Sequence, residues 1–116
     1  MRKDKAMKWV KALRSGKYKQ DSDAGVLRTE DGKFCCLGVL ADISRGGIKS
    51  GSEPFLNDYD NNCGLISEEG FPFNNNGAAV KIEHGYREYD TLADMNDAGV
   101  SFKEIAKWIE KNYKLL

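Results

Sequence analysis

The apolar centre of the chain is residues 34–42, which read FCCLGVLAD from Phe34 to Asp42. Every residue of this stretch before the aspartate is apolar or glycine, which is typical of a buried element. Periodicity alone does not separate a buried helix from a buried strand in so short a run. We predict a buried helix over residues 35–45, whose first residues could instead pair as a strand. Gly46-Gly47 ends it, because glycine adopts the left-handed C-terminal conformation cheaply.

A turn signal lies just before this stretch. The tripeptide Glu30-Asp31-Gly32 separates two short runs, residues 26–29 and 33–35. An Asp-Gly pair between two short runs is typical of a β-hairpin, because both residues tolerate the positive φ angles of tight turns. We therefore predict a hairpin that leads directly into the central helix.

The N-terminal segment is predicted to be an amphipathic helix that stops at Ser15-Gly16, and basic side chains cover its outer face. Its apolar residues recur at the helical spacing i, i+3, i+4 and i+7. These residues are Ala6, Trp9, Val10 and Leu13.

Two further helices are predicted near the C-terminus. Thr91 can cap a short helix over residues 92–95 that ends in the sequence Asn-Asp-Ala-Gly at residues 96–99. Ser101 and Glu104 form a capping box, in which each side chain covers a free backbone N–H of the other's residue. The apolar face of this last helix consists of Phe102, Ile105, Ala106, Ile109 and Tyr113.

Residues 46–90 are the least regular part of the chain. They hold seven of the twelve glycines, both prolines and six asparagines, all of which favour turns. We expect long loops here, with short strands at 64–66 and 79–83 and a second hairpin turn at His84-Gly85. Residues 1–116 are thus predicted to form a single α+β domain, in which N-terminal, central and C-terminal helices pack with a small antiparallel sheet.

Composition excludes several classes of protein. With 116 residues, 41% of them hydrophobic, the chain has the profile of one small globular domain rather than of a disordered chain. No run approaches the ~20 apolar residues of a membrane span. Lys8 and Lys11 interrupt the only candidate for the apolar part of a signal peptide. Three cysteines give no disulfide framework, so we expect reduced thiols and a cytoplasmic protein.

The net charge of zero conceals a strong asymmetry along the chain. Residues 1–20 hold eight Lys or Arg against the single acid Asp4, a net charge of +7, and the other residues carry −7. The overall balance argues against binding of duplex nucleic acid. A small anionic ligand needs only a local positive patch, so the balance does not oppose it.

The candidate ligand-binding residues lie in two segments. In the first, Arg14 and Lys17 would hold phosphates, Tyr18 would stack on a base and Gln20 would contact polar edges. In the second, the amide and carboxylate of Asn96-Asp97 would contact a base edge or a ribose. For the first segment, the alternative is a solvated helix face followed by a linker. For the second segment, it is an ordinary polar helix end.

Other chemistry finds less support in the sequence. Cys35, Cys36, Cys63 and His84 could in principle bind zinc, but adjacent cysteines on a helix point about 100° apart and no C-x-x-C is present. Core thiols are the better interpretation, as are core positions for the two tryptophans. The paired acids lie in loops and are expected to be solvated. We predict no catalytic residue, no metal ligand and no cofactor.

Three segments together resemble a widespread family of small phage and prophage proteins. The segments are residues 9–20 (WVKALRSGKYKQ), 34–42 (FCCLGVLAD) and 92–110 (LADMNDAGVSFKEIAKWIE). The chain departs from the family at Ala41, where relatives often carry a further cysteine, which weakens a thiol-based or metal role.

The resemblance implies a protein of the host bacterial cytosol that counters host defence. Several such phage families bind a cyclic nucleotide or a cyclic ADP-ribose signal and withhold it from its effector. We therefore expect sequestration of a nucleotide-type immune signal without turnover, at the interface of a homodimer, through the residues named above. The alternative is a protein-binding module that inhibits a host defence enzyme by direct contact, steered by the two oppositely charged regions.

Overall fold

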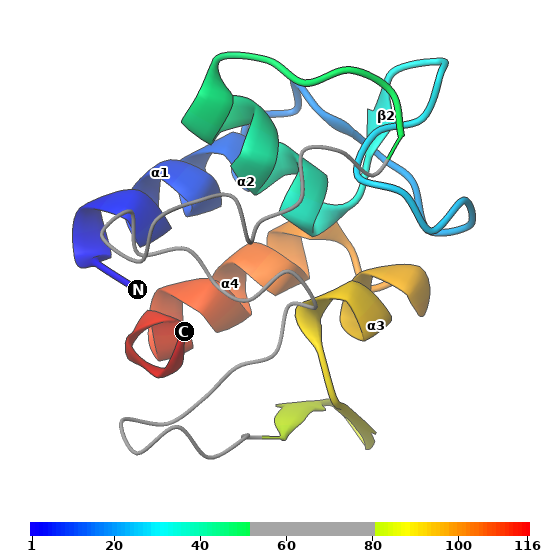
Figure 1. Ribbon diagram of the computed structural model, residues 1–116. Helices are drawn as coiled ribbons and strands as arrows, with labels where there is room; N and C mark the ends of the chain where they lie inside the picture. Colours follow the sequence, from blue (N-terminus) through cyan, green and yellow to red (C-terminus); the bar gives the residue numbers. More distant parts are fainter. Residues whose placement is uncertain (52–80) are drawn as a thin grey trace.

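The computed structural model describes residues 1–51 and 81–116 and has an α+β architecture, as predicted (Figure 1). Helices form most of it, and the strands are short and belong to two separate two-stranded sheets. The elements in chain order are α1 (Lys3–Arg14), β1 (Lys19–Gln20), β2 (Lys33–Phe34), α2 (Cys36–Arg45), β3 (Ile82–His84), β4 (Arg87–Tyr89), α3 (Leu92–Asp97), α4 (Phe102–Asn112) and the 3-10 helix η3 (Tyr113–Leu115).

The helices at the two ends of the chain lie side by side, and α2 packs against α1 (Figure 1). The apolar face predicted for α1 is confirmed, since all four of its predicted residues are buried. Trp9 is completely buried, and its indole N–H donates to the carbonyl of Cys36 at 2.9 Å. This bond satisfies the one polar group of Trp9 and fixes α1 to the start of α2.

Helix α2 confirms the prediction made for the apolar stretch. Its first six residues, 36–41, are all buried, because α1, α3 and the preceding hairpin surround them. Cys35 precedes the helix in an extended conformation, and its sulfur accepts a hydrogen bond from the Gly38 N–H at 3.3 Å. Gly46 ends the helix in the left-handed conformation, with φ of 72°.

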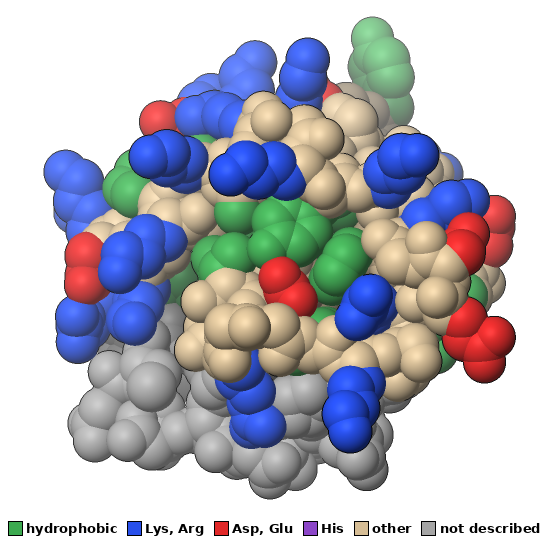
Figure 2. All heavy atoms as spheres, turned by 90° about the horizontal axis from the view of Figure 1, so that it is seen from above, with side chains coloured by type: hydrophobic (Ala, Val, Ile, Leu, Met, Phe, Trp, Pro, Cys, Tyr) green, Lys and Arg blue, Asp and Glu red, His purple; other side chains and the backbone are tan. Residues whose placement is uncertain are grey.

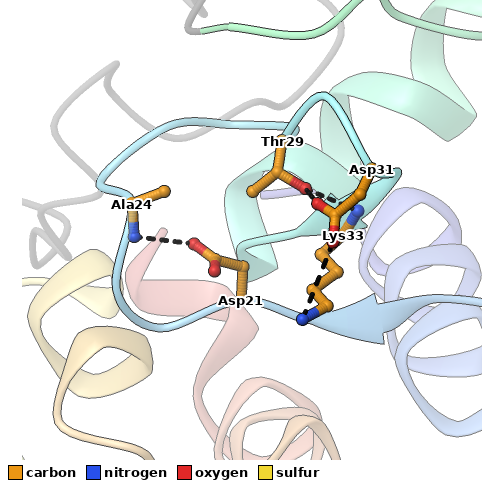
Figure 3. A network of polar contacts seen from close by, with 5 residues as sticks. All are labelled: Asp21, Ala24, Thr29, Asp31 and Lys33. Carbon is orange, nitrogen blue, oxygen red and sulfur yellow. Dashed lines mark hydrogen bonds and ion pairs between the residues drawn. The ribbon is translucent and has the colours of Figure 1, made fainter.

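The hairpin before α2 is also confirmed. The Thr29 N–H donates to the carbonyl of Lys33 at 2.8 Å, and Gly32 occupies the turn with φ of +83°. Figure 3 shows the Thr29 hydroxyl pointing at the Asp31 carboxylate across this turn, and the Lys33 backbone N–H donates to the same hydroxyl. The polar groups of this surface turn therefore find hydrogen-bond partners among the side chains of the turn itself.

The strands include one pairing that the sequence did not indicate. β1 pairs with β2 in parallel, with Lys19 opposite Lys33 and Gln20 opposite Phe34. The antiparallel pair is β3–β4, and the predicted hairpin is present, but its turn residues are Gly85 and Tyr86, because His84 still pairs with Arg87 in the strands. Of the strand predicted at 79–83, only residues 81–83 are described, and β3 begins within them; the strand predicted at 64–66 lies outside the described residues.

Both predicted caps near the C-terminus are present. The Thr91 hydroxyl accepts from the Asp94 N–H at 2.8 Å at the start of α3, and the Ser101 hydroxyl accepts from the Glu104 N–H at 3.3 Å at the start of α4.

Among the described residues, no helix has the length and apolar character needed to cross a membrane.

Gly38 is a steric constraint that predicts the effect of a substitution. A Cβ at this position would lie 1.8 Å from the carbonyl oxygen of Leu27, because the hairpin backbone crosses directly over α2. Alanine normally stabilises a helix relative to glycine by roughly 0.5–1 kcal/mol. Gly38→Ala should instead lower the free energy of unfolding by about 1–3 kcal/mol, the usual cost of overpacking.

Chemical denaturation of Gly38→Ala beside Ser44→Ala, an exposed position on the same helix, measures this effect. Ser44→Ala should change little. Equal or greater stability of Gly38→Ala would show that the hairpin does not approach α2 this closely.

Candidate functional site

The predicted residue Asn96 lies in the interior as part of a pair of amide side chains. Asn96 is completely buried, and its Oδ1 accepts from the Cys36 backbone N–H at 3.1 Å and from Gln20 Nε2 at 2.9 Å. Its Nδ2 donates to the carbonyl of Asp21 at 2.8 Å and to Asp97 Oδ1 at 3.2 Å. Both atoms of the Asn96 amide are therefore fully bonded within the chain.

Gln20 completes this amide pair. Its Nε2 donates to the carbonyl of Val100 at 2.8 Å as well as to Asn96, and its Oε1 accepts from the Phe102 N–H at 3.1 Å. Cys36 and Phe102 are the first residues of α2 and α4, whose N–H groups have no acceptor within their own helices. The two side chains thus supply the missing acceptors for two helices, and ligand contact by Gln20 and Asn96 stays a prediction.

The other predicted residues lie nearer the surface. Arg14, at the end of α1, is exposed and donates to Glu110 of α4 at 2.8 Å, which lowers the pKa of that carboxyl. Lys17 and Asp97 are exposed. Arg14 also lines a shallow depression of about 460 Å³ between α1 and α4. The structure therefore brings Gln20, Asn96 and Asp97 together, whereas Arg14 lies against α4 and does not join this group.

Tyr18 belongs to a group of side chains that we call the Tyr18 cluster, defined as Tyr18, Arg28, Phe34, Asp42 and Ile48. The Tyr18 hydroxyl donates to Asp42 Oδ2 at 2.6 Å, and its ring meets Phe34 edge-on at 4.9 Å. The other oxygen of Asp42 accepts from the Ile48 N–H at 3.0 Å. Arg28 closes the cluster, since it donates to the Ile48 carbonyl at 2.5 Å and lies over the Phe34 ring at 5.7 Å.

The face of the molecule above α2 and the β1–β2 pair is rich in cations. Figure 2 shows a small apolar patch at the centre of this face, one acidic side chain beside it, and Lys and Arg side chains around it. Three residues of the Tyr18 cluster have an exposed lysine as a chain neighbour: Tyr18 just before β1, Phe34 in β2 and Ile48 after α2. These lysines are Lys17, Lys19, Lys33 and Lys49.

The two described thiols are core residues, as predicted. Cys35 is 8% exposed and Cys36 is completely buried. Burial raises the pKa of Cys35 to about 11 and that of Cys36 well above its usual value, so both stay protonated near neutral pH. Cys63 lies outside the described residues. Within residues 1–51 and 81–116, no three His, Cys, Asp or Glu side chains are grouped as a metal ion would require.

A second depression, of about 430 Å³, lies between the β3–β4 hairpin and α4, and we call it the hairpin–α4 groove. Helix α4 contributes one stripe of side chains to it, at helical spacing, and the hairpin contributes the opposite wall. The residues that line it are Lys81, Glu83, His84, Gly85, Glu104, Lys107, Trp108, Lys111, Asn112 and Leu115.

Three kinds of group meet in this groove. The Trp108 ring is only partly buried, and its indole N–H has no acceptor among the described residues. Lys107 and Lys111 are exposed and form no ion pair with any residue that the structure describes. Glu83 and Glu104 add carboxylates, while the Lys81 ammonium already donates to Asp90. The groove therefore combines an aromatic surface, cations and hydrogen-bond acceptors.

Sequence reasoning did not select these groove residues. The prediction of a core position is confirmed for Trp9, whereas Trp108 only packs against the edge of the core. One sequence signal was present: Lys107 and Lys111 are four residues apart with Trp108 between them, on the side of α4 away from its apolar face. The hairpin wall could not be found this way, because it is distant in the chain.

A known protein family matches the N-terminal part of the chain. Residues 1–53 match a family described as a domain of unknown function (DUF8296). This region contains α1, β1, β2 and α2, and with them the Tyr18 cluster, but not the hairpin–α4 groove. Searches of the curated proteins and of the solved structures find no match to the chain.

The hydrogen bond of Tyr18 to Asp42 predicts a pH effect. Burial, and then the bond to Asp42 and its negative charge, raise the pKa of Tyr18 from 10.0 to about 12. Because the folded state binds this proton more tightly than the unfolded state, the resulting stabilisation is complete below pH 10 and is lost as the pH rises toward 12.

The free energy of unfolding of the wild type should therefore fall more steeply than that of Tyr18→Phe across this window. Denaturant titrations at a series of alkaline pH values measure both, and the groups common to the two proteins cancel in the difference. Parallel curves would mean that folding does not raise the pKa of Tyr18.

Proposed function

We propose that this protein binds a small anionic ligand of the nucleotide type and sequesters it without turnover, and that the hairpin–α4 groove is the binding site. The ligand class is that of cyclic nucleotides and cyclic ADP-ribose. The observation that carries the proposal is the convergence of Trp108, two exposed lysines that form no ion pair with a described residue, and two carboxylates in one depression of about 430 Å³. A volume of this size is typical of small-molecule sites.

Each part of a nucleotide would find a matching group in the groove. A base can stack on the exposed part of the Trp108 ring, and such stacking is sequence-tolerant because every base has a π-face. Lys107 and Lys111 would neutralise phosphate oxygens, and the indole N–H adds a donor. Carboxylates such as Glu83 and Glu104 accept hydrogen bonds from ribose hydroxyls or exocyclic amines.

The resemblance to small phage proteins supports a biological setting for this activity. In that setting the protein would act in the host bacterial cytosol as a counter-defence protein, and its ligand would be the host's immune signal. The residues predicted from sequence would then contribute indirectly: Gln20 and Asn96 hold the helices that carry the groove, and Arg14 fixes α1 to α4.

Isothermal titration calorimetry against a panel of cyclic nucleotides and cyclic ADP-ribose derivatives tests the proposal. At least one ligand should bind, and chromatography of the mixture should return it unchanged. Removing both groove lysines (Lys107→Ala with Lys111→Ala) should weaken binding about tenfold or more, since charge-assisted hydrogen bonds to phosphate are lost. Trp108→Leu should cost about 1–3 kcal/mol of binding free energy through lost stacking.

A matched control removes two exposed lysines that do not line the groove, Lys103→Ala with Lys114→Ala. This variant loses the same charge and should bind normally. Equal weakening in both double variants would indicate a nonspecific electrostatic effect. Loss of binding in Lys17→Ala, with normal binding in the groove variants, would instead locate the ligand at the residues predicted from sequence.

One observation favours the alternative, a protein-binding module that inhibits a host defence enzyme. Tyr86, at the turn of the β3–β4 hairpin, is fully exposed, and exposed tyrosines are common anchors of protein interfaces. A stoichiometric host protein that is recovered from lysate at moderate salt by the wild type but not by Tyr86→Ala would support this function. If no nucleotide binds and such a partner is found, the protein-binding function replaces our proposal.

A further inference from the structure

The guanidinium of Arg28 has one bonded edge and one edge without an acceptor. On the first edge, Nη1 donates to the carbonyl of Ile48 at 2.5 Å. On the second edge, Nε is shielded from solvent and has no hydrogen-bond partner, and no described residue accepts from Nη2. The Phe34 ring lies beneath the guanidinium, with its centre 5.7 Å from Cζ, and holds it in place.

An N–H group that is buried without an acceptor is costly. Leaving a buried donor unsatisfied costs roughly 1–3 kcal/mol, and more when the group is charged. Native proteins rarely keep such groups, so an acceptor is expected at this position. The Nε and Nη2 atoms of arginine together form a fork that matches two oxygens of a carboxylate or a phosphate.

The surroundings of Arg28 select an anion rather than a neutral acceptor. Lys49 is exposed and directly follows Ile48, whose carbonyl accepts from Arg28. Lys33 does not belong to this group, because its ammonium lies 3.8 Å from Asp31 and neighbouring side chains of a strand point to opposite faces. On the face above this region, Lys and Arg side chains surround a central apolar patch and one acidic side chain (Figure 2). The nearest carboxylate of the cluster, Asp42, already accepts from Tyr18 and from the Ile48 N–H, and it does not accept from Arg28.

We propose that the unbonded edge of Arg28 is a second binding site, for an oxyanion: a phosphate or carboxylate group held by Arg28, with the exposed Lys49 as the neighbouring cation. Because the Arg28 side chain as a whole is half-buried, the anion binds first at Nη2, and its second oxygen bonds to Nε once the atoms that shield Nε from solvent move aside. This site lies in the N-terminal region and shares no residue with the hairpin–α4 groove. It therefore does not depend on the function proposed for the groove.

Two measurements on the full chain test this site, with inorganic phosphate and acetate as probes and sodium chloride at matched ionic strength as the reference. The first is the melting temperature, which a ligand of the folded state raises with the logarithm of its concentration above Kd. The second is the ¹H–¹⁵N signal of the Arg28 Nε–H, which is protected from exchange by burial and reports directly on the bonding of this atom.

Arg28→Lys keeps the charge and removes the fork. The control is Arg87→Lys, because Arg87 also lies over an aromatic ring, 5.5 Å from the centre of Tyr89, but does not belong to the cluster. We expect phosphate or acetate to raise the melting temperature of the wild type and of Arg87→Lys. The affinity of Arg28→Lys should be about tenfold weaker, through loss of the bidentate bond.

The identity of the effective probe distinguishes the two sources of the oxyanion. A response to phosphate alone assigns a phosphate-bearing ligand, and a response to acetate alone assigns a carboxylate, such as an acidic side chain of a partner. An equal response in Arg28→Lys, or a Nε–H signal that neither probe shifts, would overturn the proposal, since the anion would then bind elsewhere or not at all. If Arg28→Lys does not fold, the wild-type Nε–H titration alone decides.

Discussion

The amide pair formed by Gln20 and Asn96 is the interaction on which the rest of the structure depends. Two side chains, from β1 and α3, accept the first N–H groups of α2 and α4 and donate to carbonyls of two loops. A helix N-terminus that is packed in the interior must find such acceptors, because water cannot reach it. Since Asn96 is completely buried, the loss of any one of these bonds would leave a polar group unsatisfied in the core.

This constraint explains where ligand chemistry can and cannot occur in the molecule. In the described part of the chain, the Gln20 and Asn96 amides bind one another and the helix starts, and the two buried thiols stay protonated. Unused donors among these residues include Trp108 and the lysines of the hairpin–α4 groove, and the edge of Arg28 above Phe34. The core positions these surfaces, because α4 and β2 both adjoin the amide pair.

Local signals in the sequence predicted the secondary structure well, but they could not predict which residues far apart in the chain contact each other. Glycine caps, Thr91, Ser101 and the apolar spacing of α1 act within a few residues, so their effects could be predicted without the fold. Gln20 and Asn96 are 76 residues apart in the chain, and nothing in the sequence around either one shows that they meet. The same holds for the parallel β1–β2 pair and for the hairpin wall of the groove. Asn96 did stand out in the sequence as a candidate ligand-binding residue, but the sequence did not indicate its hydrogen bonds in the interior.

Native-state hydrogen exchange of the wild-type protein tests the central role of the amide pair most directly. The first N–H of a helix normally exchanges fast, and Lys3 of α1, which has no side-chain cap before it, is the internal reference. If the amide pair holds α2 and α4, the N–H groups of Cys36 and Phe102 exchange only with global unfolding, together with core amides such as that of Ile105. Exchange of Cys36 and Phe102 through local opening, at rates close to that of Lys3, would contradict the account.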